Sequence, residues 1–100
     1  MGDRPESLRL DKFLWQARFF KTRGMAVDTI TARKVRVNGV KVDKSAHPVR
    51  VGDGLTFPQG REIRVIRVIG LPARRGPASE AQELYVDLDA TDAPMLPDPS

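Results

Sequence analysis

The Asn38-Gly39 pair constrains the fold of this chain more than any other feature of its sequence. Short alternating segments flank the pair, Val35-Arg36-Val37 before it and Val40-Lys41-Val42 after it. Asn and Gly both tolerate the positive φ angles of a type I′ turn, and such a pair between alternating apolar residues is the strongest short-range signal for a β-hairpin. The sequence therefore predicts a two-stranded ribbon whose apolar face consists of Val35, Val37, Val40 and Val42.

Helical periodicity occupies the segment before this ribbon. Leu10, Phe13, Leu14 and Ala17 follow the spacing of one helix face, which predicts a helix over 8–20. The sequence Lys21-Thr22-Arg23-Gly24 then interrupts the pattern, and Thr22 is a candidate N-cap for a second helix at about 23–32. Because the break is short, we expect the two helices to be neighbours in space.

Several short β-prone segments follow the ribbon, at 49–51, 55–57 and 61–69, with turns at 52–54 and 58–60. The alternation slips at Val65-Ile66, which indicates a bulge or burial on both sides. Ser79 and Gln82 have the spacing of a capping box, which predicts a short helix carrying Leu84 and Tyr85. The sequence thus predicts an α+β fold, a two-helix hairpin packed on an antiparallel sheet of about three to five strands, with a short C-terminal helix.

A chain of 100 residues forms one domain at most. We expect a flexible N-terminus at 1–7, a main domain at 8–57, a strand and short-helix extension of the same domain at 58–86, and a disordered acidic, Pro-rich tail at 87–100.

Charge is distributed very unevenly along the chain. The formal net charge is +4, yet residues 9–75 hold 16 Lys or Arg against 5 Asp or Glu, whereas residues 76–100 hold 6 acidic residues and no Lys or Arg. A basic block of this kind is typical of proteins that bind a polyanion. The alternative is a solvated basic surface without a partner. The arrangement of the charges in the fold has to distinguish between these two interpretations.

Composition argues against several other classes. The absence of cysteine removes disulfides, thiolate metal sites and a cysteine nucleophile, and fits a reducing compartment. No nucleophile with a base, metal-binding cluster or cofactor loop stands out, so we expect neither an enzyme nor a bound metal or cofactor. The sequence has no apolar run long enough to span a membrane and no signal-peptide core at its start, so we expect a cytoplasmic protein without a membrane partner.

The predicted elements bring the basic residues together. Arg9 and Lys12 fall on the polar side of the first helix, Lys21 and Arg23 at the start of the second, and further basic residues on the ribbon. The N-terminus of the second helix exposes backbone N–H groups that attract phosphate. Other residues have structural interpretations: Asp11 and Asp28 order nearby arginines or complement a helix start. Trp15 and Phe19 either stack on bases or, as we expect, pack against the segment around Tyr85.

The motifs Arg9-Leu10-Asp11-Lys12, Lys21-Thr22-Arg23, 34–39 and Val51-Gly52-Asp53 resemble the S4 RNA-binding domain, also called the alpha-L motif, over about residues 8–57. Residues 15–23, Arg74-Arg75 and 77–85 further resemble the small bacterial heat-shock members of this family. Where the family usually has a glycine that ends the second helix, this chain has Ala32-Arg33.

The resemblance implies RNA as the partner: ribosomal RNA, tRNA, and the large ribosomal subunit with a stalled peptidyl-tRNA, whose rescue or recycling the protein would assist. We expect the chain to be a monomer. A general RNA-binding module, a DNA-binding module and a protein-interaction adaptor are the alternatives. The RNA contacts that the resemblance implies are Arg9, Lys12, Lys21, Thr22, Arg23, Lys34, Arg36, Asn38 and Lys41.

Overall fold

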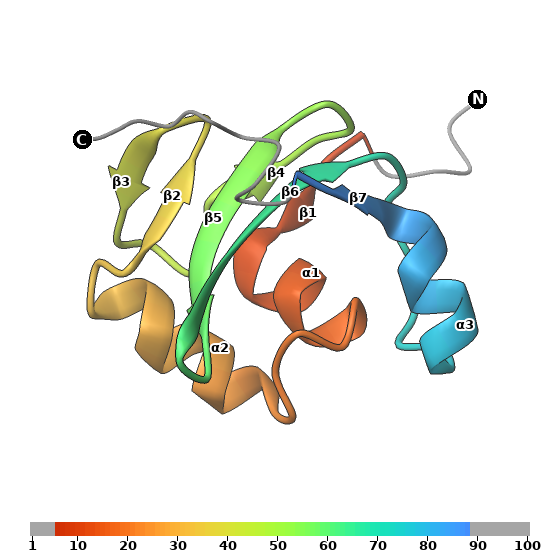
Figure 1. Cartoon of the computed structure of the whole chain (residues 1–100), viewed down its shortest axis with the longest axis horizontal. Helices are drawn as coiled ribbons and strands as arrows, with labels where there is room; N and C mark the ends of the chain where they lie inside the picture. The colour runs from red at the N-terminus through yellow and green to blue at the C-terminus, as the bar shows by residue number, and fades with distance from the viewer. Residues whose placement is uncertain (1–5, 89–100) are drawn as a thin grey trace.

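Two helices packed against an antiparallel sheet form the body of the molecule, as seen in a computed structural model that describes residues 6–88 (Figure 1). The predicted α+β architecture is confirmed. The elements, in chain order, are β1 (Leu8–Arg9), α1 (Leu10–Gln16), α2 (Arg23–Thr31), β2 (Val35–Val37), β3 (Val40–Val42), β4 (Pro48–Val49), β5 (Gly54–Gln59), β6 (Glu62–Val68), α3 (Ala78–Ala81), the 3-10 helix η1 (Gln82–Leu84) and β7 (Tyr85–Asp87).

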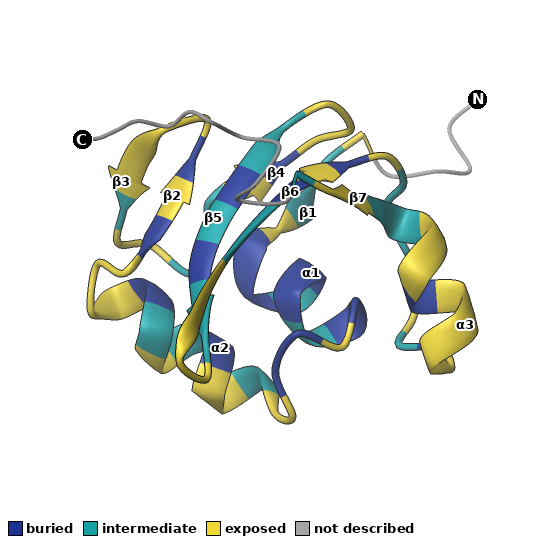
Figure 2. Cartoon of the chain, in the orientation of Figure 1, coloured by how far each residue is buried: buried dark blue, intermediate teal, exposed yellow. Residues whose placement is uncertain are grey.

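The main sheet has five strands in the order β3-β2-β5-β6-β7, and every neighbouring pair is antiparallel. Strands β1 and β4 form a separate two-stranded sheet beside α1. The inward side chains of β5 and β6 meet α1 and α2 in one hydrophobic core, which Figure 2 shows as the dark blue segments of these elements. Its largest fully buried members are Phe13, Phe57, Leu10, Leu14, Ile30, Leu55 and Ile66.

The predicted hairpin is confirmed. Asn38 and Gly39 have φ angles of 52° and 84°, as a type I′ turn requires. Val40 and Val42 pair with Val37 and Val35, so the four valines share the predicted apolar face, but Val40 is 65% exposed while Val35 and Val37 are buried. The reason is that β3 is the edge strand of the sheet, where no further strand covers it.

Helix α1 is shorter than the predicted helix over 8–20. Its first two predicted residues, Leu8 and Arg9, pair with β4 instead. The helix ends because Arg18 adopts a left-handed conformation, φ 69°, and the Phe19 N–H donates back to the Leu14 carbonyl at 3.0 Å. This is a Schellman motif, which turns the chain sharply at a helix end. Phe19 and Phe20 leave the helix but still enter the core.

Helix α2 agrees with its prediction at both ends. The Thr22 hydroxyl accepts a hydrogen bond from the Met25 N–H at 3.1 Å, which confirms the predicted N-cap. At the other end the Lys34 N–H donates to the Thr29 carbonyl at 3.2 Å, with Arg33 at φ 65°. Arg33 therefore adopts the left-handed conformation for which the wider family uses glycine.

The β5–β6 pair corrects two predictions. Of the two predicted alternatives at Val65-Ile66, the bulge is absent from this pair, because the register runs without interruption through Leu55↔Ile66 and Thr56↔Val65. Ile66 is buried and Val65 is half-buried, which is closer to the second alternative, burial on both sides. Pro58 and Gln59 belong to β5, and the turn falls at Gly60, φ 63°, rather than at Pro58. Strand β2 pairs with β5 only at Leu55 and Thr56. Pro58 has no backbone N–H, but no hydrogen bond to β2 is lost, because β2 does not reach this residue.

The C-terminal elements also differ from their predictions. Helix α3 has Pro77 at its N-cap position and no side-chain cap, so the predicted Ser79 capping box is wrong. Tyr85 is not helical but starts β7, where its ring lies 4.6 Å from that of Phe19. The predicted packing of Phe19 against the Tyr85 segment is thereby confirmed.

Strand β7 includes Asp87, and the Leu88 N–H donates to the Val65 carbonyl at 2.7 Å, so the sheet extends past the predicted start of the tail at 87. The predictions for 1–5 and 89–100 lie outside the described residues. Within the described part of the chain, none of the helices has both the length and the hydropathy needed to cross a bilayer.

Candidate nucleic-acid interface

A buried carboxylate connects the starts of α1 and α2. Asp11 is 1% exposed and accepts from both Nε and Nη2 of Arg9, each at 3.1 Å. Its second oxygen also accepts from Arg23 Nε at 3.2 Å, and its first from the Lys12 N–H at 2.8 Å. Arg9 immediately precedes α1 and Arg23 is the first residue of α2, so one carboxylate orients an arginine at each helix start. The prediction that Asp11 orders nearby arginines is confirmed.

The electrostatics of this group favour the charged form of Asp11. Burial raises the pKa of Asp11, but the hydrogen bonds from Arg9 and Arg23 lower it by more, so its pKa lies below the ordinary value. The same contact raises the pKa of Arg9. About half of each arginine side chain stays exposed, 47% for Arg9 and 42% for Arg23. Both guanidinium groups therefore keep donors directed to solvent, where a phosphate can accept them.

The segment between β3 and β4 joins the hairpin to the start of α1. The His47 carbonyl accepts from the Leu10 N–H at 2.9 Å and the Ser45 carbonyl from the Asp11 N–H at 3.1 Å, while Arg9 pairs with Pro48. A hollow of about 350 Å³ lies on this segment. Its lining includes Lys41 and Lys44 together with His47 and Pro48.

The hairpin supplies the remaining basic groups. Because Val35 and Val37 face the core, Arg36 projects from the opposite face of β2, directly across from Lys41 on β3. Arg36 Nη1 also donates to the Gly39 carbonyl at 3.3 Å, within the turn. We use the name basic surface for Arg9, Lys12, Lys21, Arg23, Arg36, Lys41 and Lys44. Contacts link several of its parts: Asp11 joins the two helix starts, and Pro48 joins Arg9 to the hollow beside Lys41. Lys12 and Lys21 are included because they lie next to Asp11 and to the Thr22 N-cap in the chain.

Two of the predicted RNA contacts, Lys34 and Asn38, are not part of the basic surface. Lys34 follows the C-terminal end of α2, so the length of that helix separates it from Arg23. The amide of Asn38 is engaged within the protein: its Nδ2 donates to Asp53 at 3.1 Å and its Oδ1 accepts from the Gly54 N–H at 2.8 Å. These bonds fasten the hairpin turn to the 52–54 turn, which gives Asn38 a structural role.

Lys44 is absent from the sequence-based set. It lies between two short strands, in a segment without periodicity, and only its place around the hollow beside Lys41 associates it with the other basic residues. Base stacking was one of two predicted roles for Trp15, the other being packing within the protein. In the structure Arg75 lies over its ring, 5.5 Å from the centroid, and donates to its carbonyl at 3.0 Å. Among residues 6–88, no three His, Asp or Glu side chains cluster so that they could hold a metal ion.

A small α+β domain that presents arginines and lysines at two helix starts and a hairpin has the build of the S4 domain, and the S4 domain family matches residues 8–55. A solved structure described as the trimeric structure of Vibrio cholerae Heat Shock Protein 15 superposes with a TM-score of 0.77, at 39% identity and with 82% of each chain covered. The chain belongs to the S4-domain family.

Within this family the chain is similar to heat shock protein 15. The protein of Escherichia coli K12 is 42% identical over 86 residues, which are 85% of this chain and 64% of the relative. The homolog from Haemophilus influenzae is 41% identical over 86 residues, 86% of this chain and 65% of the relative. The chain thus spans less than two thirds of the length of these relatives. The resemblance to small bacterial heat-shock members of the family is confirmed, whereas the expected monomer finds no support in the trimeric Vibrio relative.

Proposed function

We propose that this chain binds structured RNA through the basic surface. The observation that carries the proposal is the buried Asp11 carboxylate, which holds Arg9 and Arg23 at neighbouring helix starts with about half of each side chain exposed. Membership of the S4-domain family supports the same function. Fixed guanidinium groups bind phosphates with little loss of side-chain entropy, and the lysines beside them add attraction along the backbone of the RNA.

The finer proposal is that the RNA is ribosomal RNA, and that the partner is the large ribosomal subunit when it carries a stalled peptidyl-tRNA. Its support is the similarity to heat shock protein 15 over most of this chain, which also makes the bacterial cytoplasm the proposed compartment. The protein would then assist the rescue or recycling of the subunit by binding and not by covalent chemistry. Co-sedimentation of the chain with purified large subunits, with and without peptidyl-tRNA, tests this finer proposal.

A gel-shift panel tests the general proposal that the chain binds structured RNA. We expect the chain to bind structured ribosomal RNA fragments and tRNA more tightly than duplex DNA of equal length. A preference for duplex DNA would favour the DNA-binding alternative, and the absence of binding to any nucleic acid would favour a protein adaptor. Sedimentation velocity on the free chain measures its oligomeric state in the same buffer, which matters because an oligomer presents several basic surfaces at once.

Single substitutions connect the binding to particular residues. We expect Arg23→Ala and Arg36→Ala each to weaken RNA binding without unfolding the domain, because both side chains are partly or fully exposed. Arg74→Ala is the matched control, since it removes the same charge from an exposed arginine in the loop that precedes α3. If Arg23→Ala instead lowers the melting temperature by many degrees while the folded fraction binds normally, Arg23 is a structural residue.

A further inference from the structure

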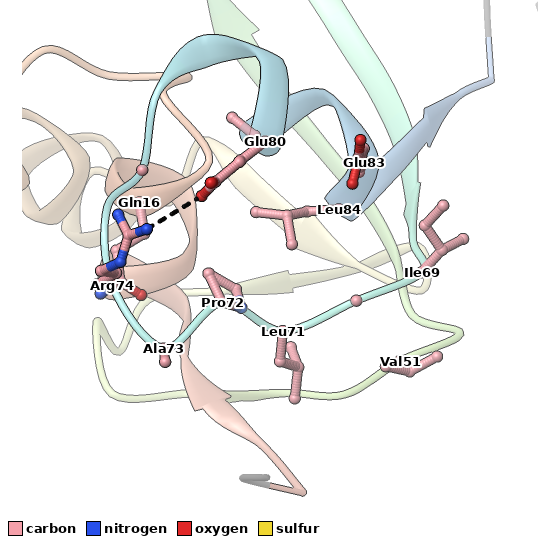
Figure 3. A pocket seen from close by; sticks show the side chains of 13 residues that line it. Gln16, Val51, Ile69, Leu71, Pro72, Ala73, Arg74, Glu80, Glu83 and Leu84 are labelled. Atoms are coloured by element: carbon pink, nitrogen blue, oxygen red, sulfur yellow. Dashed lines mark hydrogen bonds and ion pairs between the residues drawn. The ribbon is translucent and has the colours of Figure 1, made fainter.

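A large hollow beside α3 and a smaller one beside β3 differ in how their charges are engaged. In the larger, about 750 Å³, Arg74 and Glu80 pair across one end at 3.5 Å (Figure 3), and this hollow lies outside the basic surface. In the smaller, about 350 Å³, Lys41 and Lys44 lie beside Asp43, and this carboxylate forms no ion pair with any of the described residues. The smaller hollow therefore offers charged groups that the fold itself does not use.

The walls of the smaller hollow are fixed by backbone hydrogen bonds. One wall is the strand β3, and the other is the segment 43–48. The His47 N–H closes this segment into a turn, because it donates to the Lys44 carbonyl at 3.0 Å. The His47 carbonyl in turn accepts from the Leu10 N–H of α1 at 2.9 Å. A hollow held in this way is pre-formed, so an occupant loses little binding energy to rearrangement of the protein.

The lining of this hollow suits a flat, uncharged ring. Val42, Ala46 and Pro48 give it an apolar surface, and His47 adds a ring that can stack on a base. Stacking on histidine is one of the ways in which proteins hold unpaired RNA bases. A bare phosphate would be attracted by the two lysines but would lie against apolar side chains, which costs solvation free energy. The lining therefore favours a base inside the hollow, with its phosphates left to the lysines.

Asp43 selects among the bases. A carboxylate within a basic surface repels phosphate, so it opposes RNA binding unless a donor on the RNA reaches it. The two oxygens of a carboxylate bind most strongly to two N–H groups that lie side by side. Guanine is the RNA base that presents such a pair on its Watson–Crick edge, the N1–H and the N2 amino group. These donors are free when the base is unpaired.

We propose that this hollow binds one unpaired guanine of the RNA, whose N1–H and N2–H groups donate to Asp43 and whose ring stacks on His47. The phosphates on either side of the guanine lie at Lys41 and Lys44, and Arg9 lies next along the surface through its pairing with β4. The inference rests on the proposed RNA binding and adds a preference for one base to it. A surface that contacts phosphates alone has no such preference.

Binding of matched RNA hairpins to the full chain, measured by fluorescence anisotropy, tests the proposal. The hairpins share one stem and differ at a single position, which carries a bulged guanine, a bulged inosine, a bulged adenine or no extra nucleotide. We expect the guanine hairpin to bind about tenfold more tightly than the adenine hairpin, as one bidentate contact to a base provides. Inosine keeps the N1–H but lacks the N2 amino group, so it should lose most of this preference.

Asp43→Asn removes the charge at nearly constant size and separates base recognition from general electrostatics. We expect it to abolish the guanine preference, while the affinity for the fully paired hairpin rises because a carboxylate leaves the basic surface. Asp28→Asn is the matched control, since it removes the same charge from an exposed residue of α2 that does not line the hollow, and it should keep the preference. His47→Ala should weaken the guanine and adenine hairpins alike and leave the fully paired hairpin unchanged.

The outcomes separate this proposal from RNA binding in general. Equal affinity for all the hairpins, or an equal change in every affinity on Asp43→Asn, would overturn the proposal and leave RNA binding intact. It is also overturned if an uncharged dipeptide shifts the amide signals of 41–48 in an NMR titration whereas guanosine monophosphate does not, which would identify a protein as the occupant. Absence of binding to every hairpin would overturn the proposed function, and this inference with it.

Discussion

Asp11 shows how a single buried side chain organises a surface. Two half-exposed arginines at the starts of separate helices would lose considerable side-chain entropy on binding a phosphate, but their contacts with one carboxylate restrict them beforehand. The sequence suggested that Asp11 orders nearby arginines, since Arg9 is two residues away. The contact with Arg23 depends on the packing of α2 against α1, which no local pattern specifies.

Asp11→Asn tests the stabilising role of this carboxylate. We expect the free energy of unfolding at pH 7 to fall by about 1.5–3 kcal/mol, because the variant loses hydrogen bonds between charged groups at a buried position. The pKa of Asp11 in the folded protein lies below the ordinary value of about 3.9. Its contribution is therefore complete above that value and is lost as the pH falls through the folded-state pKa.

Urea unfolding of both proteins at pH 7, pH 5 and pH 3 measures this effect. The difference between the parent and Asp11→Asn should be constant from pH 7 to pH 5 and smaller at pH 3. A difference that does not change with pH would show that the charge of Asp11 contributes nothing to stability. The RNA affinity of the folded variant should also fall, since Arg9 and Arg23 lose the group that orients them.

The ends of α1 are features that the sequence specified poorly. Both α1 and α2 end in a Schellman motif with an arginine in the left-handed position, Arg18 and Arg33. Glycine is the ordinary residue at this position, so no residue pattern predicts that α1 stops at Gln16. The β2–β3 hairpin was predictable because its signal is local, at Asn38-Gly39. Strand β7 was not, because Tyr85 becomes extended only through pairing with Val68, which is distant in the sequence.

Arg33→Gly should stabilise the protein. A left-handed residue other than glycine costs about 1–2 kcal/mol, while glycine costs about 0.5–1 kcal/mol more entropy in the unfolded chain, so we expect a net gain of about 0.5–1 kcal/mol. Thermal unfolding by circular dichroism measures the difference. Unchanged or lower stability would mean that the exposed Arg33 side chain contributes interactions of its own.

Arg18→Gly is the informative companion variant. Glycine at position 18 should give the same gain in the free energy of unfolding, because it also relieves a left-handed backbone conformation. The variant, however, loses the hydrogen bond from Arg18 Nε to the Gly76 carbonyl, which fastens the 72–77 segment to the end of α1. We therefore expect Arg18→Gly to be less stable than Arg33→Gly by about 1 kcal/mol. Equal stabilities would indicate that this hydrogen bond adds nothing to the folded state.

At the scale of the whole molecule, positive and negative charges are separated. The basic surface gathers residues from 9 to 44, while the carboxylates of α3, η1 and β7 lie beyond residue 79. The uneven charge was visible in the sequence, whereas the RNA contacts at Arg9, Lys12, Lys21, Arg23, Arg36 and Lys41, which the family resemblance implied, stay predictions. The structural engagement of Asn38 and the position of Lys44 required the fold, because both depend on contacts between turns.

The acidic residues at the C-terminal end should weaken RNA binding. Residues 89–100 contain Asp89, Asp92 and Asp98 and no basic residue, so they repel phosphate and compete for the basic surface. Deletion should begin at 89 and not at 87, because Asp87 pairs with Arg64 at 2.6 Å within the sheet. We expect the shortened chain to bind RNA more tightly at low salt in a filter-binding assay. An unchanged affinity would exclude competition by this segment.

The salt dependence of RNA binding tests the central claim most directly. About five phosphate contacts predict a slope of about −3.5 to −4.5 in a plot of log affinity against log salt concentration. Each of Arg23→Ala and Arg36→Ala should reduce the magnitude of this slope by about 0.7–1, while Arg74→Ala should leave it unchanged. A slope near zero for the parent chain, or equal reductions for all three variants, would contradict the account of a basic surface that binds RNA phosphates.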